Sequence, residues 1–159
     1  MDDICGVEKH LLCTSVDALN VEEFLAAQEP IYSQVKAELK SGRKVTHWMW
    51  FIFPQLSGLG SSAMAQKFGL RSLEDARTYL HHPVLGSRLR ECTRLLIDLE
   101  EKPIQQILGA PDDLKLRSCL TLFSAAAPDE SLFRQALNKY FDGAPDAKTL
   151  QLIRRTSTE

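Results

Sequence analysis

Apolar residues recur every three or four positions over most of this chain, the spacing that places them on one face of an α-helix. The clearest stripe is formed by Leu85, Leu89, Cys92 and Leu96. The sequence contains no run of alternating apolar and polar residues, the pattern of a half-buried strand, and no Asn-Gly hairpin signal. The spacing therefore predicts helices throughout.

Start and stop residues for helices fall where this spacing is interrupted. Asn20, with Glu23 three positions later, predicts the first helix. Pro30 interrupts that helix, and Gly42 ends its continuation as a left-handed C-cap. Similar signals predict further helices at 73–81 behind a Ser72 cap, at 85–96, at 103–109, from Pro111 onward, from an Asp129 cap to about position 143, and at 146–153.

These elements predict an all-α protein with a single multihelical domain of about seven or eight helices. The length of 159 residues suits one domain. We expect a flexible N-terminal arm over 1–19, the helical domain over 20–153 and a disordered tail over 154–159. The sequence shows no internal repeat and no low-complexity tract that would divide it further.

The segment from Arg43 to Gln55 differs from the rest, because it contains both tryptophans and an unbroken apolar run at 48–53. A helix that is apolar on every side must be buried on every side. A buried strand has the same pattern in so short a run, but no other strand is available to pair with it. We therefore expect a central buried aromatic helix, with Thr46 as its N-cap and Pro54 as its stop.

Polar residues lie at both ends of this aromatic segment. Lys44 and His47 are at the N-terminal end, where free backbone N–H groups favour an anion. Gln55 and the loop 57–62 are at the other end, but the loop matches neither a Walker A motif nor a dinucleotide fingerprint. His47 is the catalytic candidate for proton transfer, and a structural histidine is the alternative. Trp48 is a candidate wall of a ligand pocket, and core packing is the simpler role of the aromatic residues.

A second group of candidate ligand-binding residues shares one expected helix: Lys115, Arg117 and Ser118. Lys115 and Ser118 are on one face, and Asp113 and Arg117 are on a neighbouring face. The simpler interpretation is an Asp113–Arg117 ion pair on a solvated surface. The functional interpretation is that Lys115 or Arg117 joins Lys44 around an anionic group, with Ser118 beside it.

The sequence predicts no metal site and no cofactor. His81 and His82 are adjacent, so on a helix their side chains point about 100° apart. None of the four cysteines forms a C-x-x-C pair, and Cys92 and Cys119 are expected as small buried side chains among leucines. His82, before Pro83, is expected to bond the last carbonyls of its helix.

The motif GRK-x-x-HWMWFIFPQ at 42–55 resembles that of the DUF1810 family of proteins of unknown function. Shorter matches at 82–86, 113–118 and 140–141 extend the resemblance over 17–153. The resemblance implies a multihelical fold with a buried central helix, and it implies no activity. The resemblance also implies arginine at two positions where this chain has Glu23 and Ser61. If those arginines contribute to a ligand site in the family, the site of this chain is altered.

The net charge of −2 gives no global basic field, so nucleic acid is the weakest class of partner. The longest apolar run is too short to span a membrane, and the acidic start of the chain is not a secretory signal. We expect a soluble, cytoplasmic protein that binds a small anionic ligand, for example a phosphorylated or nucleotide-like one. If the protein is an enzyme, this ligand is its substrate. The alternative is a non-catalytic protein-interaction module.

Overall fold

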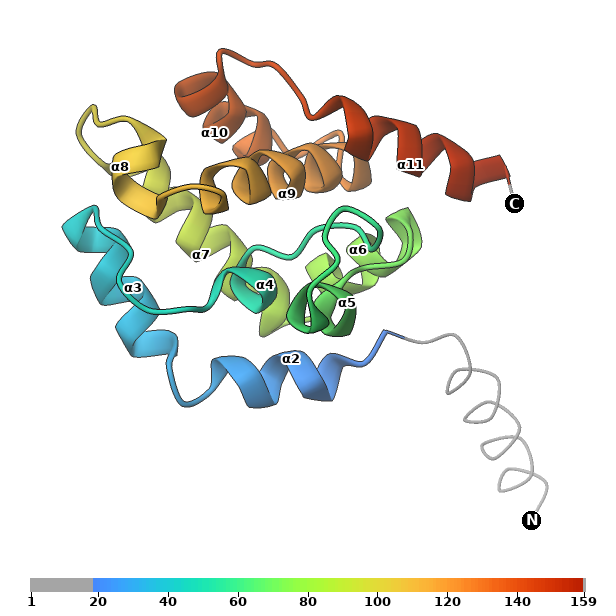
Figure 1. The fold of residues 1–159 in the computed structure, drawn as a ribbon, viewed down its shortest axis with the longest axis horizontal. Helices are drawn as coiled ribbons and strands as arrows, with labels where there is room; N and C mark the ends of the chain where they lie inside the picture. The colour runs from blue at the N-terminus through green and yellow to red at the C-terminus, as the bar shows by residue number, and fades with distance from the viewer. Residues whose placement is uncertain (1–18, 159) are drawn as a thin grey trace.

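Ten helices make up the part of the chain that this computed structural model describes, residues 19–158. Figure 1 shows α9 across the middle of the molecule, with α10 and α11 above it and α2 along the opposite side. The helices are α2 (Val21–Gln28), α3 (Tyr32–Ser41), α4 (Met49–Ile52), α5 (Ala63–Phe68), α6 (Leu73–His81), α7 (Leu85–Asp98), α8 (Ile104–Leu108), α9 (Asp112–Ala126), α10 (Leu132–Phe141) and α11 (Ala147–Thr158).

The described residues form no strand, only an isolated parallel bridge between Leu56 and Leu70, so the predicted all-α class is confirmed. The arm expected over 1–19 lies outside the described residues, except for Leu19, which packs against the core. Within residues 19–158, no helix is long and apolar enough to cross a membrane.

Three of the expected helix signals are confirmed at the level of atoms. Asn20 accepts a hydrogen bond from the backbone N–H of Glu23 at 3.3 Å, and Ser72 accepts one from that of Asp75, also at 3.3 Å. Gly42 ends α3 with a left-handed backbone at φ 74°. Each signal acts within one helical turn, which is why the sequence alone was sufficient to predict it.

The aromatic segment is buried, as expected, but its helix is a single turn. α4 spans only Met49–Ile52, and its N-cap is Trp48 instead of the expected Thr46. Thr46 does not cap α4 because its hydroxyl donates to Glu38 Oε2 at 2.7 Å. The predicted central aromatic helix is therefore present but shorter than expected, because Glu38 holds the residues before it in a non-helical path.

Of two other local predictions, one is wrong and one is confirmed. No side chain caps α10, so the expected Asp129 cap is wrong, and Arg134 instead anchors this turn by donating to the Pro128 carbonyl at 2.7 Å. The ring of His82 accepts hydrogen bonds at Nδ1 from the backbone N–H groups of Val84 and Leu85, at 3.1 and 3.2 Å. His82 also ends α6 as expected, because its backbone N–H donates to the carbonyls of Thr78 and Tyr79 at 3.1 and 3.3 Å. The bonds of its ring to the start of α7 were not expected.

Two segments are helical where no helix was expected. α5 follows a loop without an apolar stripe, and Ser62 caps it by accepting from the backbone N–H of Ala65 at 3.1 Å. The tail expected over 154–159 is helical up to Thr158, because α11 continues beyond the buried side chain of Ile153.

The core is built around α9, which packs against α6, α8, α10 and α11, and around α7, which packs against α3, α4, α6 and α10. Cys92 and Cys119 are both buried there, as predicted. Aromatic side chains connect the helices through ring contacts with centroids 5.2 to 5.7 Å apart, namely Phe24–Phe68, Phe24–Tyr79, Phe51–Phe68, Tyr79–Phe123 and Phe123–Phe133.

Candidate functional site

Glu38, on α3, holds the segment that leads into α4. Its Oε1 accepts from the backbone N–H groups of Val45 and Thr46, at 2.7 and 3.0 Å, and from the indole N–H of Trp48 at 3.0 Å. Its Oε2 accepts from Thr46 Oγ1 and Gln34 Nε2 at 2.7 and 3.0 Å. Burial opposes ionisation of this carboxyl, but these hydrogen bonds outweigh it and lower the pKa of Glu38 from 4.5 to about 2.

Because Glu38 fixes the residues that follow it, Lys44 lies against the start of α9. Its backbone N–H donates to the carbonyl of Ile107 at 2.6 Å, and its Nζ lies 2.9 Å from Asp112 Oδ2. Lys115, from the first turns of α9, places its Nζ 3.5 Å from Asp112 Oδ1. We call Lys44, Asp112 and Lys115 the lysine–aspartate cluster. It has a formal net charge of +1 and joins residues that are far apart in the sequence.

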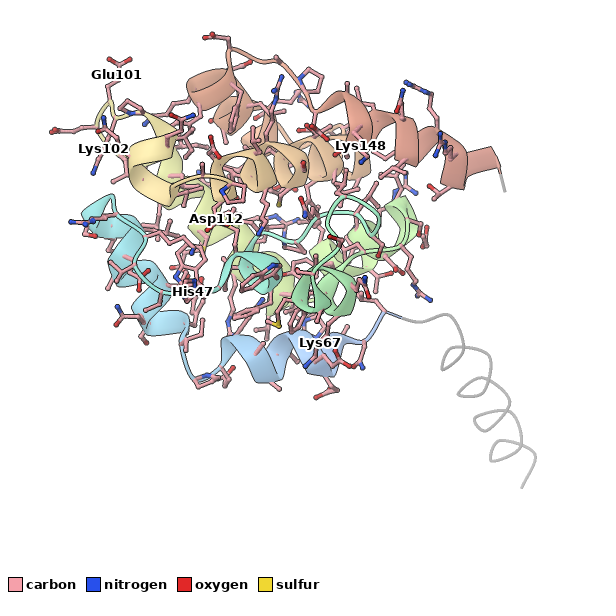
Figure 2. The ribbon with its side chains drawn as sticks, in the orientation of Figure 1. His47, Lys67, Glu101, Lys102, Asp112 and Lys148 are labelled. Atoms are coloured by element: carbon pink, nitrogen blue, oxygen red, sulfur yellow. The ribbon has the colours of Figure 1, made fainter. Side chains whose placement is uncertain are left out.

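The three side chains of this cluster differ in exposure. The side chain of Lys44 is 6% exposed, that of Asp112 19% and that of Lys115 24%. Figure 2 shows Asp112 at the start of α9, on the same side of the view as His47. The cluster is therefore buried at Lys44 and partly open to solvent at Lys115.

Each lysine of the cluster lies over one tryptophan ring. Lys44 Nζ is 5.1 Å from the ring centroid of Trp48, and Lys115 Nζ is 5.0 Å from that of Trp50. Both are cation–π distances. Trp48 is 1% exposed, whereas Trp50 is half-buried and its Nε1 has no hydrogen-bond partner among the described residues. Trp48, the predicted wall of a pocket, is therefore buried in the core, and Trp50 is the more exposed of the two tryptophans.

His47 is exposed, and no hydrogen bond or ion pair with another described residue fixes its ring. Its exposure argues against the alternative of a buried structural histidine. Gln55 is half-buried, and together with Trp50 it lines a hollow of only about 10 Å³. This hollow holds about one water molecule and is too small for a ligand.

Arg117 and Ser118 do not join the lysine–aspartate cluster. Arg117 Nε donates to the Ala144 carbonyl at 2.9 Å, and the guanidinium lies 5.9 Å from the ring of Phe141. Ser118 is buried, and its hydroxyl donates to the Leu114 carbonyl at 3.2 Å within α9. Of the predicted helix-borne candidates, Lys115 is the one that the fold brings to Lys44.

Sequence reasoning missed a second buried polar group that positions α4. Gln28 is fully buried, and its Nε2 donates to the Phe51 carbonyl at 2.6 Å and to Tyr79 Oη at 3.0 Å. Arg88 Nη1 donates to Gln28 Oε1 at 3.2 Å. The available signal was position: Gln28 follows Phe24 by four residues and thus shares its buried helical face.

No group of three or more His, Cys, Asp or Glu side chains in residues 19–158 is placed to hold a metal ion. Four larger surface hollows, of about 250 to 540 Å³, have linings without Lys44, His47 or Lys115. Two of them share Glu101 and Lys102, which Figure 2 labels at the loop between α7 and α8. The lysine–aspartate cluster is thus outside all four.

Comparison with known proteins identifies the family. The model of the family described as "Protein of unknown function (DUF1810)" matches residues 18–153, and the chain belongs to this family. The chain is also similar to a solved structure, that of the conserved hypothetical protein Rv1873 from Mycobacterium tuberculosis, at 47% identity and a TM-score of 0.85. The similarity covers 87% of this chain and 99% of that one. No curated protein matches the chain.

Proposed function

We propose that the protein binds a small anionic ligand at Lys44 and Lys115. The observation that supports this is the convergence of two ammonium groups, from distant parts of the sequence, on the two oxygens of one carboxylate. Ammonium groups bind carboxylate and phosphate oxygens with charge-assisted hydrogen bonds. The two lysines are therefore arranged to bind an acidic group, and in this structure that group is the side chain of Asp112.

The surroundings of the cluster favour such a ligand in two ways. The net positive charge attracts anions. The half-buried ring of Trp50, under Lys115, offers an apolar surface for the body of a ligand, which can include the base of a nucleotide. If the ligand is converted, His47 is our candidate to transfer the proton, and the lysines stabilise the developing negative charge.

A thermal-shift comparison of wild type with Lys115→Ala tests this proposal. The probes are inorganic phosphate, a nucleoside monophosphate and a short dicarboxylate, at constant ionic strength. A ligand at 100 times its Kd stabilises the folded protein by about 2.7 kcal/mol, which raises the Tm of a chain of this size by roughly 5–10 °C. We expect a rise in wild type that Lys115→Ala abolishes.

The matched control is Lys148→Ala, which removes an exposed lysine on α11. It should keep the full rise in Tm. A ligand-induced rise that persists in Lys115→Ala contradicts the proposed site.

His47→Ala separates a binding role from a structural one. Because His47 is exposed, its removal should change the free energy of unfolding by less than about 0.5 kcal/mol. We expect an unchanged Tm without ligand and a smaller ligand-induced rise. A lower Tm without ligand would assign His47 to the fold, and an undiminished rise would remove it from the site.

A second candidate function, a protein-interaction module, is favoured by two exposed apolar side chains. Val45 is 67% exposed and Leu114 is 57% exposed, and each is next in sequence to a lysine of the cluster. A protein partner would remove this apolar surface from water. If no anion raises the Tm, a photo-crosslinking residue at position 45 or 114 tests this function, and the absence of a specific crosslinked partner counts against it.

A further inference from the structure

Lys44 requires a negative partner inside the fold. Its side chain is 6% exposed, and its ion pair among the described residues is with Asp112, at 2.9 Å. Removal of one member of a buried ion pair leaves the other charge uncompensated, which strongly destabilises the folded protein. Lys44 can therefore release Asp112 only if another anion replaces it in the same exchange.

Asp112 is better placed to leave the cluster. It is the first residue of α9, its side chain is 19% exposed, and its carboxylate is held by the two lysines. A carboxylate in the first turn of a helix is stabilised by the helix dipole, whether or not a cation is paired with it. Asp112 can thus turn toward solvent without losing all of its electrostatic stabilisation.

The arrangement of the two ammonium groups fits a carboxylate. Lys44 Nζ faces Oδ2 and Lys115 Nζ faces Oδ1, so each oxygen of a two-oxygen group has its own donor. A phosphate group brings further oxygens that neither lysine faces. The two ammonium groups therefore match the two oxygens of a carboxylate.

We infer that Asp112 is an internal substitute for the acidic group of the ligand, and that the ligand is a carboxylic acid. Its carboxylate replaces that of Asp112 between Lys44 and Lys115, and no covalent bond is formed or broken. This inference rests on the proposed function and narrows its ligand class from anions in general to carboxylates.

Replacement of Asp112 by alanine in the full-length chain tests the inference, with acetate and formate as the probes. We expect Asp112→Ala to lower the Tm by roughly 10 °C, because Lys44 loses its counter-charge. Acetate and formate should restore most of this loss, whereas chloride at the same ionic strength should not. Wild type should gain less from acetate, because Asp112 competes with it.

Tryptophan fluorescence gives an independent readout of the same exchange. Each of the two tryptophans of the chain lies about 5 Å from a lysine ammonium of the cluster. Movement of the ammonium groups on acetate binding should therefore change the emission of Asp112→Ala. Asp75→Ala is the matched control, since Asp75 is a buried carboxylate 2.9 Å from Arg71. Its emission should respond to acetate no more strongly than that of wild type.

If Asp112→Ala does not fold, Asp112→Asn takes its place, because it removes the charge and keeps the volume. By fluorescence, this variant should bind acetate about tenfold more tightly than wild type, a difference of about 1.4 kcal/mol. Restoration by acetate and formate, but not by phosphate or chloride, supports the inference.

Restoration by phosphate to the same extent overturns the carboxylate assignment. The absence of any response to acetate in either variant overturns the exchange with Asp112. The proposed function fails separately, if no anion raises the Tm of wild type or if Lys115→Ala retains the rise.

Discussion

At the level of single residues, the carboxylate of Glu38 supplies the hydrogen-bond acceptors for residues 43–48, which do not form a helical turn. The backbone N–H groups of Val45 and Thr46, which would otherwise need helical or solvent partners, bond to Glu38 instead. The indole N–H of Trp48 bonds to the same oxygen, so a ring that is otherwise apolar can be fully buried. This single side chain thus directs Lys44 toward α9.

The pH dependence of stability should reveal this role of Glu38. Its pKa is lowered from 4.5 to about 2 in the folded protein, so its contribution is fully present above pH 4.5 and is lost as the pH falls toward 2. A difference of this size corresponds to about 3 kcal/mol. We expect the free energy of unfolding, measured with urea, to fall across this range, and the fall to be smaller by about that amount in Glu38→Gln.

Glu38→Gln should also be less stable at pH 7, because its amide N–H₂ group faces other donors. Glu101→Gln, which changes an exposed glutamate, should stay within about 0.5 kcal/mol of wild type at pH 7. An identical pH profile for Glu38→Gln and wild type would show that the hydrogen bonds of Glu38 do not stabilise the fold.

At the level of helices, α6 and α7 approach each other more closely than a side chain allows. A Cβ atom on Gly86, in the first turn of α7, would lie 1.9 Å from the Leu80 carbonyl oxygen of α6. That oxygen cannot move without disturbing α6, and Arg90 Nη1 also donates to it at 3.3 Å. The angle between the two helices therefore depends on glycine at this position.

Gly86→Ala should destabilise the protein by about 3 kcal/mol, because the two helices must separate to admit the methyl group. Urea unfolding followed by circular dichroism measures this change. Ser87→Ala, on the exposed surface of the same helical turn, should stay within about 0.5 kcal/mol of wild type. Equal stabilities of the two variants would mean that α7 shifts freely against α6.

At the level of the whole molecule, buried side chains from α2 to α11 belong to one continuous hydrophobic cluster. A shared core makes it costly for any helix to unfold alone, so the described domain should unfold in one cooperative step. Figure 1 shows why the aromatic segment takes part in that step: α4 lies among α2, α3, α5 and α7 near the centre of the fold.

Two probes with different locations can test this cooperativity. Tryptophan fluorescence reports only on Trp48 and Trp50, whereas far-UV circular dichroism reports on all helices. We expect both to give the same urea midpoint and the same free energy of unfolding. A fluorescence midpoint at clearly lower urea would show that the aromatic segment opens before the helices melt.

The sequence by itself determined most of the helices and many of their ends, because these depend on contacts within a few residues. The caps at Asn20, Ser72 and Gly42 and the apolar stripe of α7 are interactions within single helices. The sequence also determined that the aromatic segment is buried, since so many adjacent apolar side chains can avoid water only inside a core.

The tertiary structure alone decided how the aromatic segment is held and what its polar neighbours meet. Glu38 and Gln28 have the polar side chains that sequence patterns assign to a surface, yet they are buried because hydrogen bonds satisfy them. The partners of Gln28 come from distant elements, and those of Glu38 come from the non-helical segment that follows α3. Likewise, the sequence proposed that Lys115 or Arg117 joins Lys44, and packing selected Lys115 and supplied Asp112 as its partner. Such pairings depend on the relative positions of whole helices, which no local spacing specifies.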